Sequence, residues 1–371
     1  MTTEPQFSEK IQEILDKYFN DDAQTIFNSS DLLKYITNKT KSANSGSKSR
    51  SSFGNLYAIY VLLEDYKLKG FIENPNYSKY EGATFGDLFS RQRELPFGSK
   101  LQNHALNHRL NEEFRKFFPT TEYIPIVRDL KKNRYWFNEN LIIVKVKKKN
   151  FNLCEAILEI IEEYIKSKKD SFDKFIEACE TLKTIIDHDK ESAQTFILSL
   201  LSPNSDARLF EIVSYSILKY FYLDQKLYWG FDTTSLNEDY LKLYKTGRTN
   251  ANDGGIDFVM KPLGRFFQVT ETVEVTKYFL DIDKIERYPI TFVIKSMESS
   301  ELLRNKLELD AHKKYGIDVV VHSYMMCIEE IINIPNLIEI FDSSTRAGHL
   351  NSILDEIIIQ SKVEFNYDTE N

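Results

Sequence analysis

The chain has 371 residues, 42% of them hydrophobic, and a formal net charge of -8. This length and apolar content suit a globular protein of two or three domains. No apolar run approaches the roughly eighteen residues of a membrane span, and the N-terminus lacks the features of a secretory signal, so we expect a cytoplasmic protein without a membrane anchor. Cys154, Cys179 and Cys327 lack CxxC or CxxH spacing, which argues against a zinc site or a disulfide framework.

The average charge conceals a basic region. Between Arg91 and Lys149 there are 14 Lys and Arg against 6 Asp and Glu, so this part is positive while the remainder is strongly acidic. A basic region within an acidic chain is compatible with a nucleic-acid partner, although a solvated charged surface has the same composition.

The first residues show helical spacing of apolar side chains. Residues 8–19, 30–40 and 52–68 repeat apolar positions every three or four residues, which predicts a small helical bundle. Between the second and third helices lies KSANSGSKSRSS, which includes Lys48 and Arg50. This segment is either a plain polar linker or a loop that binds phosphates through hydroxyls, backbone amides and cations.

A stretch rich in arginine and amide side chains follows, GDLFSRQRELPFGSKLQNHALNHRL. Forked donors and acceptors of these kinds match base edges in a major groove. The candidate DNA-binding residues here are Arg91, Gln92, Arg93, Lys100, Gln102, Asn103, His104, Asn107, His108 and Arg109. Residues 102–109 have a helical pattern that suits groove entry, and a solvated amphipathic helix is the alternative. The two histidines lack the acidic partner of an HExxH metal motif.

The segment RDLKKNRYWFNENLIIVKVKKKN then predicts an aromatic-rich turn and a strand that ends in lysines suited to phosphate contact. Residues 151–201 read as a helical connector, with two helices separated by the charged KSKKDS. After it, Ser205 or Asp206 can cap a further helix with a broad apolar face. Glu211 lies beside that face, where a carboxylate is expected to meet a cation.

The stretch DGGIDFVMKPLGRFFQVTETVEV predicts two adjacent strands joined by a turn. Alternation puts Ile256, Phe258 and Met260 on one face and Asp257 on the other. Along the second strand Gln268, Thr270 and Thr272 share a face. The pairing brings a carboxylate close to neutral oxygen donors, and with Glu211 it offers the hard oxygens that Mg²⁺ prefers.

These residues resemble the PD-(D/E)XK nucleases, especially those with Mrr-like or resolvase-like catalytic domains. The similarity lies in a helix with a glutamate, FEIVSYSIL, then DGGIDFV and then FFQVT, and it covers residues 206–295. The resemblance implies that Asp257 and Gln268 hold Mg²⁺, that Glu211 completes or orients the site, and that the metal activates the water that attacks a phosphodiester. Together with the basic region, it implies a Type II restriction endonuclease.

The chain departs from this family at one position, because Thr270 stands where the family has a lysine. Three explanations are open. Lys277 or Lys245 supplies the ammonium from elsewhere, the Thr270 hydroxyl orders the water, or the nuclease is inactive. Asp253 is a second candidate ligand, and it also fits a turn.

The remaining sequence continues an α/β pattern. ITFVIKS predicts a buried strand, ELLRNKLELDAHKKYG a helix that ends at Gly316, IDVVVHSYMM a strand and HLNSILDEIIIQ a closing helix. We therefore expect an α/β protein with a helical and mixed DNA-recognition region over 1–150, a helical connector over 151–201 and a nuclease core over 202–371, in which helices flank a mixed sheet.

Three functional hypotheses follow. The first is a Mg²⁺-dependent Type II restriction endonuclease that cuts specific double-stranded DNA as a homodimer, with a DNA methyltransferase as its genetic partner. The second is a modification-dependent, Mrr-like endonuclease, for which Tyr135, Trp136 and Phe137 offer aromatic side chains without a clear pocket. The third is a DNA-binding protein with a decayed nuclease fold, and Thr270 favours it.

Overall fold

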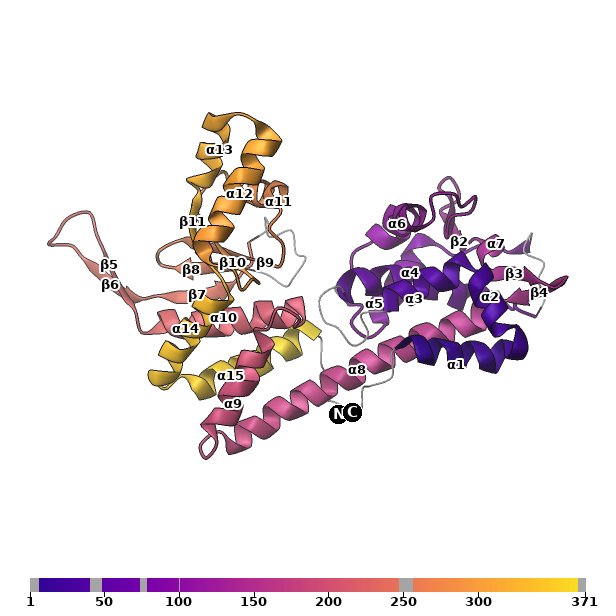
Figure 1. Ribbon diagram of the computed structural model, residues 1–371, viewed down its shortest axis with the longest axis horizontal. Helices are drawn as coiled ribbons and strands as arrows, with labels where there is room; N and C mark the ends of the chain where they lie inside the picture. Colours follow the sequence, from indigo (N-terminus) through magenta and orange to yellow (C-terminus); the bar gives the residue numbers. More distant parts are fainter. Residues whose placement is uncertain (1–6, 41–48, 74–78, 100, 247–255, 366–371) are drawn as a thin grey trace. The chain divides into compact units, whose positions relative to one another are not determined.

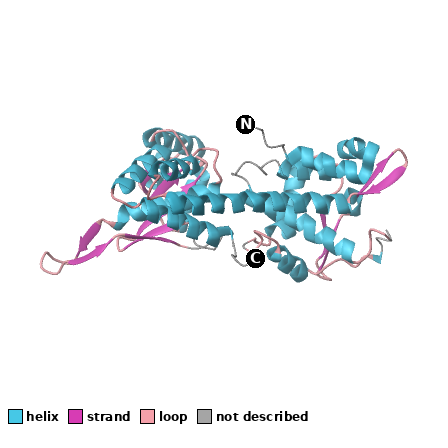
Figure 2. Ribbon diagram, turned by 90° about the horizontal axis from the view of Figure 1, so that it is seen from below, coloured by secondary structure: helices cyan, strands magenta, loops and turns pink. Residues whose placement is uncertain are grey.

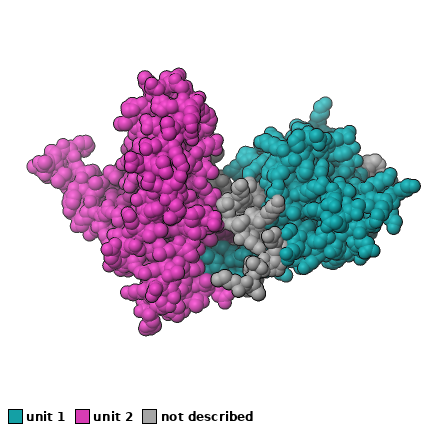
Figure 3. All heavy atoms as spheres, viewed as in Figure 1, with its two compact units in different colours: residues 1–175 teal, residues 176–371 magenta. Residues whose placement is uncertain are grey.

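The computed structural model describes residues 7–40, 49–73, 79–99, 101–246 and 256–365, with backbone alone for 49–52. The chain divides into two compact units, residues 1–175 and residues 176–371 (Figure 3). Helices make up most of the described structure, and strands are short in both units (Figure 2). Each unit is described by itself below.

The first unit contains a helical core with two small antiparallel strand pairs. Its elements are α1 Phe7–Phe19, η1 Asn20–Asp22, α2 Ala23–Ser29, α3 Asp31–Thr40, α4 Ser49–Leu68, α5 Phe85–Glu94, the π-helical turn η5 Ala105–Arg109, α6 Leu110–Phe117, β1 Ile126–Asp129, β2 Arg134–Phe137, α7 Glu139–Ile142, β3 Ile143–Val146, β4 Lys149–Asn152 and the start of α8 Cys154–Ile185. The three N-terminal helices expected from periodicity are confirmed, because α1, α3 and α4 bury their apolar faces in one core.

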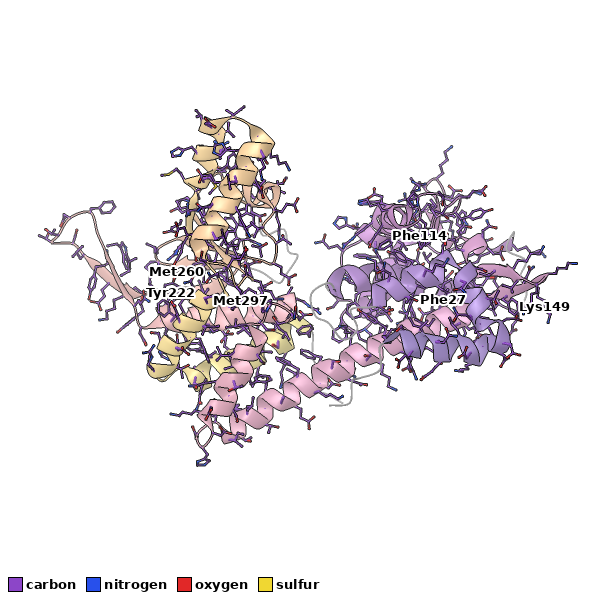
Figure 4. The ribbon with its side chains drawn as sticks, viewed as in Figure 1. Phe27, Phe114, Lys149, Tyr222, Met260 and Met297 are labelled. Carbon is purple, nitrogen blue, oxygen red and sulfur yellow. The ribbon has the colours of Figure 1, made fainter. Side chains whose placement is uncertain are left out.

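The strand pairs correct one expectation and confirm another. β1 pairs with β2, and β3 pairs with β4. The aromatic stretch expected as a turn forms β2, where Tyr135 and Phe137 are buried, so these rings pack in the core. The lysine-rich strand end is confirmed, and Lys149 points outward from the β3–β4 hairpin (Figure 4).

Helix α8 is continuous from Cys154 to Ile185, although two helices were expected. The charged KSKKDS stretch contains no Pro or Gly, and its lysines have good helix propensity. The Ser171 hydroxyl donates to the Ser167 carbonyl at 2.8 Å, which keeps this serine compatible with the helix. Charge alone was therefore a poor signal for a break.

The second unit places a five-stranded mixed sheet between helices (Figure 1). Its elements are α9 Lys190–Leu200, α10 Ala207–Leu223, β5 Lys226–Trp229, β6 Asn237–Tyr240, β7 Lys242–Lys245, β8 Phe258–Lys261, β9 Arg265–Thr270, α11 Val275–Lys284, β10 Ile290–Ile294, α12 Ser300–Tyr315, α13 Asp318–Met325, β11 Ile328–Ile332, α14 Ile334–Arg346 and α15 Leu350–Phe365. The sheet order is β11-β10-β9-β8-β7. Strand β8 runs antiparallel to β7 and β9, whereas β9, β10 and β11 are parallel.

Different helices cover the two faces of this sheet. On one face α10 packs its aromatic side chains on the strands: the Tyr215 ring lies 5.2 Å from Phe258, and Tyr222 lies 6.2 Å from Phe267. Tyr222 and Met260 are labelled in this part of Figure 4. On the other face α11, α12 and α13 bury apolar side chains against β10. The expected mixed α/β architecture is thus present in the second unit.

Local expectations for this unit were partly right. The Asp206 carboxylate caps α10 by accepting the Arg208 backbone N–H at 2.8 Å, and Gly316 ends α12 in a left-handed conformation with φ 62°. The strand expected to continue past Thr270 ends there, and α11 follows from Val275. The segment expected as a strand around residues 317–326 is helix α13.

None of the described helices combines the length and apolar character needed to cross a membrane.

Candidate nuclease site at the end of the central sheet

Polar side chains gather at one end of the sheet in the second unit. This end contains the start of β8 and the ends of β9 and β10, because β8 is antiparallel to β9 and β10 is parallel to it. Open sheets commonly bind ligands beyond the carboxyl ends of their parallel strands. Asp257, Gln268 and Thr270 therefore come from neighbouring strands to the same end, as the sequence predicted.

Asp257 immediately precedes β8. Its backbone N–H donates to the Phe267 carbonyl at 2.9 Å, and its own carbonyl accepts the Thr246 N–H at 3.1 Å. Its carboxylate Oδ2 accepts the backbone N–H of Val269 at 2.7 Å. The two neighbouring strands thus hold the Asp257 backbone, and β9 orients its carboxylate.

Gln268 lies on β9 between Phe267 and Val269, the two residues whose backbone groups bond Asp257. Its side chain is only 9% exposed. The amide Nε2 donates to the Val269 carbonyl at 3.3 Å, while the buried Oε1 has no hydrogen-bond partner among the described residues. A buried amide oxygen without a donor is costly unless a ligand satisfies it.

Asp257 and Gln268 supply some of the oxygen ligands that a hard divalent cation requires. One supplies an anionic oxygen and the other an orphaned neutral oxygen, which is the donor chemistry of Mg²⁺ sites. Within the described ranges, no three His, Cys, Asp or Glu side chains cluster as they would around a metal ion. Asp253 lies outside the described residues.

Glu211 is on the face of the sheet that α10 covers. Its Oε1 lies 3.0 Å from Nζ of Lys245, and both side chains are 13% exposed. Lys245 pairs in register with Phe258, so strand alternation places it and Asp257 on different faces. The cation expected opposite Glu211 is therefore Lys245, and this lysine is engaged in a largely buried ion pair.

Thr270 and Lys277 lie together on the face that α11 covers. Thr270 is 4% exposed, and its hydroxyl contacts the Thr272 backbone. Nζ of Lys277, from the first turn of α11, lies 3.4 Å from the Thr270 Oγ1. An ammonium from a helix is thus next to Thr270, where the sequence resemblance leads us to expect a lysine. In the described part of the chain Lys277 forms no ion pair with a carboxylate.

A buried lysine that the sequence reasoning did not identify lies at the end of β10. The Lys295 side chain is 2% exposed, and its Nζ contacts Glu271 Oε1 at 2.9 Å and the Ser205 carbonyl. Its backbone N–H donates to the Thr270 carbonyl at 2.9 Å. Lys295 therefore connects the ends of β9 and β10 to the start of α10. A lysine that directly follows the fully buried strand ITFVI was the available signal.

The candidate base-reading residues of the first unit are only partly on its surface. Arg91 is held by Glu64 at 2.7 and 2.8 Å, and this hydrogen-bonded carboxylate raises the pKa of the guanidinium. Gln92 is completely buried, and its amide donates to the Gly54 carbonyl at 3.3 Å. The Gln92 amide thus lies inside the unit and not where a base edge could meet it, which corrects its assignment.

The other described candidates are Arg93 on α5 and residues in or just before the π-helical turn η5. Arg93, Gln102, His104, His108 and Arg109 are exposed, and Asn103 and Asn107 are half-buried. The rings of His104 and His108 lie 5.8 Å apart, edge to face. Lys48 and Lys100 lie outside the described residues, as does the side chain of Arg50.

No family model, curated protein or solved structure matches this chain.

Proposed function

We propose that the chain is a Type II restriction endonuclease whose second unit hydrolyses phosphodiester bonds in double-stranded DNA with Mg²⁺. The observation that supports this most strongly is that Phe267 and Val269 of β9 bond Asp257 on either side of Gln268, whose amide oxygen is orphaned, at the end of a mixed sheet. The order of elements, α10 and then β7, β8, β9, α11 and β10, suits the PD-(D/E)XK arrangement that the sequence resembles.

In this proposal Asp257 and Gln268 would hold the cation. A bound Mg²⁺ would polarise the phosphate and favour deprotonation of the attacking water. Asp257 is oriented for this role by the Val269 N–H. Lys277 would stabilise the charge that develops on the phosphate, because its ammonium stands at Thr270 without a neutralising carboxylate among the described residues.

Two other lysines near the site suit structural roles better. Lys245 is paired with Glu211, and Lys295 is almost completely buried between Glu271 and Ser205. Neither ammonium is available to a phosphate without first losing its partner. Lys277 is therefore our choice for the residue that replaces the family's lysine.

The exposed residues around η5 are the proposed DNA contacts of the first unit. Arginine and amide side chains there can read bases, and basic side chains can bind phosphates. Each strand of a symmetric site requires its own scissile centre, so a homodimer is part of the proposal. A methyltransferase encoded beside this chain would protect the host DNA from such an enzyme.

One alternative has a specific observation in its favour. Thr270 is buried and its hydroxyl is occupied by neighbours, so it is poorly placed to order a water. If Lys277 does not replace the missing lysine, the fold would serve a DNA-binding protein without cleavage. The buried positions of Tyr135 and Phe137 give no support to an aromatic cage for a modified base.

The test is cleavage of unmethylated and methylated phage DNA by the purified chain, with Mg²⁺ and with EDTA. We expect discrete fragments from unmethylated DNA that require Mg²⁺. Asp257→Asn should lower the rate about 10³-fold and Lys277→Met about 10²-fold, as losses of groups that stabilise the transition state do. The matched control is Lys313→Met, which removes a lysine of α12 whose side chain is 75% exposed.

Each contrary outcome has a distinct meaning. Tight Mg²⁺-independent binding without cleavage of either DNA would refute the nuclease and favour the binding protein. Cleavage of methylated DNA alone would favour the modification-dependent enzyme. Full activity in Lys277→Met would remove this lysine from the proposed site while leaving the nuclease intact.

A further inference from the structure

The β5–β6 hairpin of the second unit exposes several large apolar side chains close together. We name residues 226–240 the aromatic hairpin, and in Figure 1 it projects from the sheet of its unit. Its exposed members are Tyr228 at 55%, Trp229 at 39%, Leu236 at 54%, Tyr240 at 44% and Phe231, which is fully exposed. Single exposed apolar residues are common, but a cluster of this kind marks an interaction surface.

The tip of the aromatic hairpin is an ordered turn. The Asp232 carboxylate accepts the Thr234 backbone N–H at 2.8 Å and the Thr234 hydroxyl at 2.6 Å. At Gly230 an added Cβ would lie 2.4 Å from the Ser235 carbonyl oxygen, so the chain closes tightly there. This turn keeps the Phe231 ring exposed to water, so the ring buries no apolar surface within its own unit.

In the described structure the hairpin is a separate two-stranded sheet that no third strand joins. Isolated two-stranded hairpins are at best marginally stable in water, and a further apolar surface usually covers them. Both outer strand edges also carry backbone groups that another strand could pair. The feature therefore calls for a partner that supplies apolar area or a strand edge.

Its charges argue against a nucleic acid as that partner. Lys226 pairs with Glu238, and Lys242 pairs with Asp239 at 3.1 Å, so both nearby lysines are already neutralised. The only other charged residue between them is Asp232. A phosphate backbone requires free cations and is repelled by an unpaired carboxylate at the tip.

One face of the hairpin is complementary to itself. Antiparallel register places Lys226, Tyr228, Glu238 and Tyr240 together, so this face presents one cation, one anion and two rings. Nζ of Lys226 lies 5.2 Å from the centre of the Tyr240 ring. When two copies pack about a two-fold axis, every contact occurs twice, because the same pair of residues also meets with the two copies exchanged. Each Lys226 can then face the Glu238 of the second copy.

We infer that the aromatic hairpin binds the same hairpin of a second copy of this chain, with tyrosine rings stacked and Lys226 facing Glu238 across the two-fold axis. Phe231 and Leu236 extend the contact at the tip. This assigns a surface to the homodimer of the proposed function, but it rests on the hairpin alone and does not require cleavage.

The experiment measures the mass of the full chain by sedimentation and light scattering, with charge-reversed variants. The wild type is expected to be a dimer. Lys226→Glu and Glu238→Lys should each be monomeric at the same concentration, because every cross-axis contact becomes a like-charge pair. An equimolar mixture should dimerise again, since each contact then joins opposite charges. Restoration by mixing shows that neither variant failed merely by unfolding.

Phe231→Ser supplies a second variant, with an expected increase of about tenfold or more in the dimer dissociation constant. The matched control, Val319→Ser, removes a side chain of α13 that is 79% exposed and should leave the dimer unchanged. A monomeric wild type, or a dimer that resists Phe231→Ser and both charge reversals, would overturn the inference. DNA cleavage is scored separately, so a failed dimer and a failed nuclease give different results.

Discussion

Lys295 and Glu271 form an ion pair whose two members differ in their access to water. The lysine side chain is 2% exposed and the glutamate side chain 32%. Removing the glutamate would leave a buried ammonium whose remaining contacts in the described structure include the Ser205 carbonyl and the Phe210 ring. Removing the lysine would leave a carboxylate that water can reach. The two deletions are therefore not equivalent.

We predict that Glu271→Leu lowers the free energy of unfolding by about 3 kcal/mol, the cost of an unpaired buried charge. Lys295→Met should cost only about 1 kcal/mol, mainly from the lost hydrogen bond to Ser205. Urea unfolding curves measure both. The matched control is the exposed pair of Lys306 and Glu298, where either deletion should change stability by less than about 1 kcal/mol. Equal losses for the two buried residues would contradict this account.

At the scale of residues, the sequence predicted best those contacts that adjacent strands and their connecting turn determine. Asp257 lies beside the β9 residues that flank Gln268 because one short turn joins β8 to β9 and fixes their antiparallel pairing. The cation opposite Glu211 was expected, and it is Lys245. The contact between Lys295 and Ser205 was not predictable, because it joins residues far apart in the sequence through the packing of α10 on the sheet.

At the scale of an element, the π-helical turn η5 bears on the proposed DNA contact. The Leu110 N–H donates to the Ala105 carbonyl, which widens the turn by one residue relative to an α-helix. His104, His108 and Arg109 are exposed on this turn, while Ala105 and Leu106 are buried. The wider turn thus anchors one side in the core and presents the other to solvent.

We predict that Arg109 contributes one phosphate contact. Arg109→Gln should weaken binding to all duplexes and reduce the slope of log affinity against log salt concentration by about 1. Fluorescence anisotropy at several salt concentrations measures this slope. Arg115→Gln, an exposed arginine of α6 outside the candidate set, is the control and should leave the slope unchanged. Equal effects of both variants would indicate unspecific attraction to a basic surface.

Periodicity predicted most helices, but it failed where composition and context disagreed. Val319, Val320 and Val321 favour a strand by propensity, yet they lie in α13, where Val321 packs into the core and Val319 is exposed. Tertiary packing overrode a weak local preference. In α8 the reverse occurred, because a charged stretch without Pro or Gly continued the helix through the expected break.

For the whole molecule, buried thiols in both units contribute to the response to alkaline pH. Burial raises the pKa of Cys154 in the first unit and Cys179 in the second to about 12, from an ordinary value of 9.0. The folded state thus keeps protons that the unfolded chain loses. The stabilisation is complete below about pH 9 and is lost as pH rises toward 12.

Between pH 9 and 10.5 each of these thiols should remove about 1–2 kcal/mol from the free energy of unfolding. Urea unfolding across this range measures the loss. Cys179→Ala should make the alkaline decline shallower while leaving the slope below pH 8.5 unchanged. A variant whose decline matched that of the wild type would show that this thiol does not retain its proton in the folded state.

The hydrogen bond from the Val269 N–H to the Asp257 carboxylate also makes one backbone amide a reporter of the proposed site. A cation that binds Oδ2 competes with the Val269 N–H for this oxygen atom and weakens the bond. The Val269 amide should then exchange its hydrogen faster in Mg²⁺ than in EDTA, although cation binding slows exchange in most proteins. Hydrogen exchange at the single Val269 amide would then show whether a cation occupies the proposed site.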